Sequence, residues 1–180
     1  MWIIIIAIVA VLALWVISIQ NKLVKSDEIC NNALKQINVQ QISRYDALQA
    51  LVKLTREYAA YEGETLQNVI EARKITSSAA PTAAQINENE KALQDMSAKL
   101  IAVAEAYPEL KANENYKQTM ADLKGYEENV RLSRMTFNDT VTRFNQEVRV
   151  FPASVVAGML GFGPREYLAD DVSKKDYPVI

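Results

Sequence analysis

The sequence predicts an all-α protein, in which an N-terminal transmembrane helix is followed by an antiparallel, coiled-coil-like bundle of three long helices plus one short C-terminal helix. Three observations predict this class. An unbroken apolar run opens the chain, apolar residues then recur at spacings of three and four, and the prolines fall between these repeats. No window alternates apolar and polar residues as a half-buried strand would, so we expect no β-sheet.

The N-terminal run, WIIIIAIVAVLALWVISI, contains Ser18 as its only polar side chain. As a helix it would span roughly 27 Å, close to the hydrocarbon thickness of a bilayer. Trp2 and Trp15 lie near its two ends, where indole rings favour the interface. A cleaved signal peptide is the alternative, but no basic residue precedes the run and no small-x-small cleavage site follows it. We therefore expect residues 1–20 to remain as a transmembrane anchor.

The lysines predict how the anchor is oriented. Lys22, Lys25 and Lys35 follow the apolar run, whereas only the terminal amine precedes it. Because basic residues accumulate on the cytoplasmic side, we expect the N-terminus outside and the following domain in the cytoplasm.

Residues 21–163 are predicted to form the bundle. The first helix can run from the anchor to about Ile75, since this stretch has no proline and Gly63 is its one glycine. Thr82 begins the second helix, with Gln85 placed three residues later as in a capping box. This helix should end at the motif YPEL.

The third predicted helix is capped by Asn113 and runs to Phe151. After Pro152, the segment ASVVAGMLGFG is typical of a short apolar helix that glycines end. Residues 164–180 are expected to form a polar, irregular tail.

Charged residues interrupt the apolar stripes of these helices. The third helix's stripe is apolar except at Glu127 and Arg134. Isolated buried charges cost several kcal/mol each, so these side chains should pair across helices or line a wet groove. We favour a polar layer that fixes helix register, and a groove for a ligand or partner is the alternative. The predicted layer or groove comprises Arg44, Glu62, Arg73, Glu127, Arg134, Asn138 and Asn145.

Composition argues against several functions. The net charge is −2 with both signs well mixed, so no basic field for nucleic acid is present. The chain has no histidine, and its single cysteine, Cys30, lacks metal-site spacing. The glycines form no phosphate-binding pattern. We therefore expect no enzymatic activity and no cofactor or metal, with a carboxylate-dependent enzyme as the weakest alternative.

Three blocks suggest a family. VQQISRYDALQALVKLTREYAAYEGETLQNVIEAR, YPELKANENY and FNDTVTRFNQEVRVFPASVVAGMLGF, in this order after one apolar segment, resemble the LemA family. The resemblance implies a bacterial protein of the cell (inner) membrane, built as an anchored helical bundle whose domain is often cytoplasmic. It implies no enzymatic activity. The matching positions include Arg44, Tyr45, Asp46, Tyr58, Glu62, Ala72, Arg73, Pro108, Asn138, Asn145, Pro152 and Phe162.

Helix lengths raise the question of a partner. If the second helix folds back along the first, it ends near residue 50 and leaves the membrane-proximal stripe uncovered. That stripe comprises Leu23, Cys30, Ile37, Tyr45 and Leu48. Either the C-terminal segment returns to cover it or another copy does, and we expect a homo-oligomer. The predicted function is a membrane-tethered scaffold, with a sensor or adaptor module as the alternative.

Overall fold

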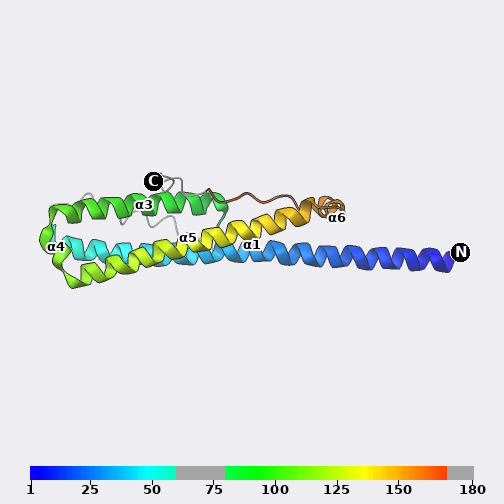
Figure 1. Ribbon diagram of the computed structural model, residues 1–180, viewed down its shortest axis with the longest axis horizontal. Helices are drawn as coiled ribbons and strands as arrows, with labels where there is room; N and C mark the ends of the chain where they lie inside the picture. Colours follow the sequence, from blue (N-terminus) through cyan, green and yellow to red (C-terminus); the bar gives the residue numbers. More distant parts are fainter. Residues whose placement is uncertain (60–79, 170–180) are drawn as a thin grey trace, which may run out of the picture.

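The computed structural model describes residues 1–59 and 80–169, and this part of the chain is helical with no strand. The predicted Glu62 and Arg73 therefore lie outside the described residues. Figure 1 shows a long α1 whose N-terminal part projects beyond the other helices, which lie along the rest of its length. The helices are α1 (Trp2–Tyr58), α3 (Ala83–Ala106), α4 (Pro108–Ala112), α5 (Glu114–Arg149) and α6 (Ala153–Leu160).

The helix α1 is continuous from the apolar N-terminal run into the bundle. Its first turns touch nothing else in the described chain, and residues 2–18 are all exposed. By length and composition α1 is the one helix in the described ranges able to cross a membrane. The helix ends at Tyr58, because Ala59 has φ −123° and ψ 57°. The prediction that it continues to Ile75 is therefore wrong.

Local capping signals set the other helix ends. Thr82 and Gln85 form the predicted capping box at the start of α3. The Asn113 side chain accepts a hydrogen bond from the Tyr116 backbone N–H at 3.1 Å at the start of α5. Gly161 ends α6 in the left-handed conformation, with φ 78°. The short α4, which the sequence reading did not predict, starts with Pro108 in the first turn, where proline is favoured.

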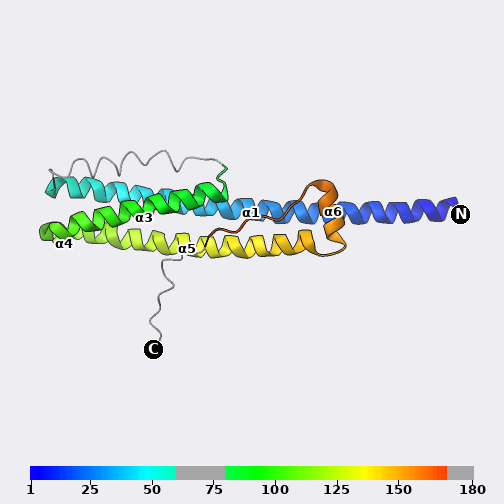
Figure 2. The same ribbon diagram turned by 90° about the horizontal axis from the view of Figure 1, so that it is seen from above.

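The direction of α3 differs from the prediction. Gln41 of α1 contacts Ile86 of α3, and three residues further on Arg44 contacts Glu90, so the two helices are parallel. By contrast, α5 is antiparallel to α1, since Arg44 meets Glu127 whereas the earlier Ser26 meets Glu147. Figures 1 and 2 show α3 extending away from the N-terminus and α5 returning toward it. The second helix therefore does not fold back along the first.

This topology covers the membrane-proximal stripe. Because α5 returns beside α1 over the whole length of the bundle, the five stripe residues are buried within one chain. Their exposed fractions are 1% for Leu23, 0% for Cys30, 0% for Ile37, 6% for Tyr45 and 0% for Leu48. The expectation that another copy covers this stripe is wrong, because later segments of the same chain bury it.

The core is divided into two clusters along the bundle. The proximal cluster, nearer the anchor, contains Leu23 to Ile37 of α1 and Val130 to Val148 of α5. The distal cluster contains Tyr45 to Val52 of α1 and Leu123 of α5. On each helix the break between the clusters coincides with a charged residue.

Candidate functional site

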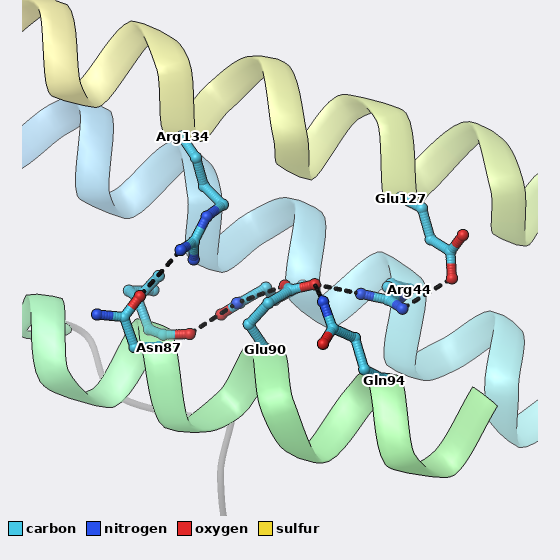
Figure 3. Close-up of polar contacts among 8 residues, drawn as sticks. Arg44, Asn87, Glu90, Gln94, Glu127 and Arg134 are labelled. Atoms are coloured by element: carbon cyan, nitrogen blue, oxygen red, sulfur yellow. Dashed lines mark hydrogen bonds and ion pairs between the residues drawn. The ribbon is translucent and has the colours of Figure 1, made fainter. Parts of the chain in front are cut away.

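A polar layer lies between the two core clusters. On α1, Gln41 and Arg44 lie between Ile37 of the proximal cluster and Tyr45 of the distal one. On α5, Glu127 lies between Leu123 and Val130, and on α3, Glu90 lies between Ile86 and Leu93. Figure 3 shows these side chains converging from three helices.

Arg44 is the centre of this layer. Its Nη1 lies 2.6 Å from Glu90 Oε1, and its Nη2 lies 2.7 Å from Glu127 Oε1. The Arg44 side chain is only 3% exposed, so the two carboxylates supply the charge and hydrogen bonding that water cannot. The prediction had grouped Arg44 and Glu127, and the structure brings them together.

Glu90 was missing from the predicted set. Besides binding Arg44, it accepts hydrogen bonds from Gln41 at 3.1 Å and from Gln94 at 3.3 Å. The Gln41 side-chain amide also donates to the Ile86 carbonyl at 3.0 Å. The sequence signal was present, since Glu90 lies four residues after Ile86 and so interrupts the α3 stripe as Glu127 interrupts that of α5.

Arg134 has different partners. It lies two turns beyond Glu127 and donates to Asn87 Oδ1 at 3.0 Å and to the Ala169 carbonyl. Figure 3 shows Arg134 reaching α3 at some distance from Arg44 along the bundle. It therefore ties α5 to α3 and to the C-terminal segment rather than completing the Arg44 cluster.

Asn138 and Asn145 hold the C-terminal strap, residues 162–169, against the bundle. The Asn145 side chain accepts from the Arg165 N–H at 2.8 Å and donates to the Arg165 carbonyl at 2.9 Å. Asn138 makes the same pair of bonds to Leu168, at 3.0 and 3.2 Å. Asn138 and Asn145 are seven residues apart on α5, which is a rise of about 10.5 Å. Arg165 and Leu168 are three residues apart in extended backbone, which is about 10 Å. The two asparagines therefore have the spacing of the two backbone positions that they bind.

Arg165 fixes the strap to α1. Its guanidinium donates to Asp27 Oδ1 at 2.8 Å and to Asn31 Oδ1 at 2.7 Å. Its guanidinium carbon lies 5.7 Å from the centre of the Phe144 ring, a cation–π distance. The Phe162 ring contacts the Phe144 ring edge-on, with 6.4 Å between the two ring centroids. These contacts could not be predicted from periodicity, because an extended segment has no helical repeat.

Two titratable groups lie in the core outside the polar layer. Burial raises the pKa of the Cys30 thiol, although Thr140 and Arg165 partly oppose this. Burial also raises the pKa of Tyr116. Both groups are therefore neutral at pH 7, and the shift of Cys30 makes its thiol a poor nucleophile.

The charged side chains of the polar layer bind one another within the bundle. Within residues 1–59 and 80–169, no group of three or more histidine, cysteine, aspartate or glutamate side chains could hold a metal ion. Gln41 Oε1, Arg44 Nε and Arg134 Nη1 are buried without a hydrogen-bond partner among these residues. The other polar atoms of Arg44 bind carboxylates inside the bundle, which is what a register-fixing layer requires.

The fold and the polar layer together define a class of protein. It is a helical bundle whose first helix begins with an apolar segment long enough to cross a membrane. Residues 33–180 match the LemA family, and the chain belongs to it. Magnetosome proteins MamQ 1 and MamQ 2 of Paramagnetospirillum magneticum (strain ATCC 700264 / AMB-1) are each 29% identical to it over 82 residues. That region is 46% of this chain and spans only 30% of each relative's length.

Proposed function

We propose that this protein is a membrane-anchored, non-enzymatic scaffold that holds a helical bundle at the surface of a bacterial cell membrane and self-associates there. The continuous helix α1 carries the proposal. It joins an exposed apolar segment to a buried core without a linker, so a bundle attached in this way keeps its axis fixed relative to the anchor. The N-terminus lies outside and the bundle in the cytoplasm, as the lysines after the anchor favour.

The polar layer supports a structural role for the bundle. Arg44 binds one carboxylate from α3 and one from α5, so sliding either helix along α1 would separate buried charges. A bundle with a fixed register presents one defined surface, which suits a protein that acts by contact.

Self-association must use surfaces other than the membrane-proximal stripe, whose residues are buried within the chain. The exposed apolar side chains of residues 2–18 are the largest such surface in the described chain. We therefore place the contact between copies within the bilayer, through packing of one anchor on another.

The test is the mass of the full-length protein extracted in mild detergent, measured by analytical ultracentrifugation with correction for bound detergent. The expected mass is a multiple of 20.2 kDa. A matched variant replaces Trp2–Ile19 with leucines, which keeps the span but changes the packing surface, and it should shift toward the monomer. A monomeric wild-type protein would overturn self-association, and recovery in the soluble fraction without detergent would overturn the anchor.

The sensor or adaptor alternative has less support. It requires the polar layer to be open to a ligand, whereas the Arg44 side chain is 3% exposed and already binds two carboxylates. Of the two carboxylates that Arg44 binds, the Glu127 side chain is 39% exposed and that of Glu90 is 13% exposed.

A further inference from the structure

A groove of about 400 Å³ lies where the anchor meets the bundle. Its walls include Trp15 and Ile19 of α1 together with Phe151 and Pro152, which connect α5 to α6. Trp15 belongs to the apolar run and is exposed. The α5–α6 connection therefore reaches the axial level of the last turn of the anchor.

An ion pair lies at the groove, on the side away from the anchor. Lys22 Nζ lies 3.1 Å from Glu147 Oε1, and the Lys22 side chain is 68% exposed. Going toward the anchor, the next residues that line the groove are Ile19 on α1 and Val150, which directly follows α5. The boundary between water and hydrocarbon thus lies between the Lys22–Glu147 pair and Phe151, if α1 crosses the bilayer as proposed.

The helix α6 has two distinct faces at this boundary. Figure 2 shows it crossing α1 rather than running beside it, so it lies roughly in the plane of a membrane that α1 traverses. Val156 and Ala157 are buried, and Ala157 packs in the proximal cluster. Val155 and Met159 of α6 are 55% and 82% exposed, and Phe151, which lies just before the helix, is 78% exposed.

The composition of this segment suits an interface. Residues 150–164 contain no charged side chain, and Arg149 and Arg165 flank them. An apolar helix face exposed beside a membrane span, with basic residues on its flanks, is typical of a helix lying in the headgroup region.

We propose that the α5–α6 connection and α6 form a second membrane contact, with Phe151, Val155 and Met159 inserted among the acyl chains of the leaflet that faces the bundle. The occupant of this face is lipid, because the anchor places the face at the level of the acyl chains. This contact rests on the proposed anchoring, and it restrains the rotation of the bundle about the anchor axis.

The test places nitroxide labels in the full-length protein reconstituted in lipid nanodiscs. Single cysteines at Met159 and Val155, in a Cys30→Ala background, report the proposed contact. Met135→Cys on α5, whose native side chain is 54% exposed, is the aqueous control, and Ile8→Cys in the anchor is the lipid control. The measurement is the ratio of collision rates with oxygen and with a water-soluble nickel chelate.

We expect the ratio at residues 155 and 159 to exceed that at residue 135 and to approach that at residue 8. Ratios at 155 and 159 equal to that at 135, with residue 8 still in lipid, would overturn this inference and leave the anchor intact. A label at 159 shielded from both reagents and dipolar-broadened by a second label would also overturn it, because another copy would then occupy the face. An aqueous ratio at residue 8 would overturn the anchor itself.

Discussion

Arg44 of α1 and Glu127 of α5 are 83 positions apart in the chain, yet their side chains meet with 2.7 Å between Nη2 and Oε1. Glu90 of α3 binds the other end of the same guanidinium at 2.6 Å. One arginine thus joins α1 to both α3 and α5 through ion pairs. Several measurable consequences rest on this pair and on the contacts around it.

Removing the Arg44 charge should destabilise the bundle strongly. Arg44→Met leaves Glu90, whose side chain is 13% exposed, without its counter-ion. We expect the free energy of unfolding to fall by an amount near the lower end of about 3–5 kcal/mol, because Glu127 is partly solvated and can relax into water. Urea unfolding in detergent, followed by circular dichroism, measures the change.

Arg131→Met is the matched control for Arg44→Met. This substitution removes an ion pair to Glu128 in which both side chains are about half exposed. The free energy of unfolding should therefore fall by no more than about 0.5 kcal/mol. Equal losses for the two variants would contradict the role of Arg44 in fixing register.

Asn145→Ala should loosen the strap without unfolding the bundle. The substitution removes both hydrogen bonds to the Arg165 backbone, and an unpaired backbone group costs about 1–3 kcal/mol, or about tenfold or more in local opening. Hydrogen exchange at the Arg165 amide measures this opening. Asn129→Ala on the exposed face of α5 is the control, and exchange that is unchanged in Asn145→Ala would refute the clamp.

Stability should fall at alkaline pH. Burial raises the pKa of both Cys30 and Tyr116, so above the unfolded-state values, about pH 9–10, the unfolded chain releases protons that the folded chain retains. The contribution is therefore present at neutral pH and is lost as pH rises. Unfolding curves between pH 7 and 10.5 should show a smaller decline in Cys30→Ala and Tyr116→Phe. An identical decline in wild type and the double variant would exclude these groups as its source.

Two glycines should respond to alanine with opposite signs. Gly125 lies inside α5 with open space around the position of an added Cβ, so Gly125→Ala should stabilise by about 0.5–1 kcal/mol. Gly161 has φ 78°, so Gly161→Ala should destabilise the end of α6 by about 1 kcal/mol. Unfolding midpoints check both, and a stabilised Gly161→Ala would contradict the left-handed cap.

The orientation of the anchor can be read by labelling. In intact cells, a membrane-impermeant maleimide should not reach Asn129→Cys but should reach a cysteine added before Trp2, because the lysines follow the span. Native Cys30 should stay unlabelled in the folded protein, since it is fully buried. The reverse labelling pattern would invert the proposed topology.

The helices were predictable from sequence because their signals are local. Thr82 with Gln85, Asn113, and the glycine after Leu160 each mark an end that the structure confirms. The interruption of an apolar stripe by Glu127 likewise marked the polar layer, because a buried charge requires a partner.

The direction of α3 was not predictable in the same way. Helical periodicity is the same for parallel and antiparallel neighbours, so the apolar stripes did not reveal how α3 is directed relative to α1. The wrong direction led directly to the wrong expectation for Leu23 and Cys30, which α5 covers. The packing of the strap against the bundle was not predicted for another reason. The side-chain amides of α5 bind the backbone of Arg165 and Leu168, and irregular backbone has no sequence period to detect.

If α1 crosses a bilayer as proposed, its unbroken length also makes the molecule a lever. About 38 residues separate the last turn of the anchor from Tyr58, an arm of roughly 57 Å. If the bilayer thinned or thickened enough to tilt the anchor by about 20°, an ordinary angle for such helices, the far tip would sweep sideways by about 20 Å. Changes in lipid thickness would thus be magnified into large displacements at the end farthest from the membrane.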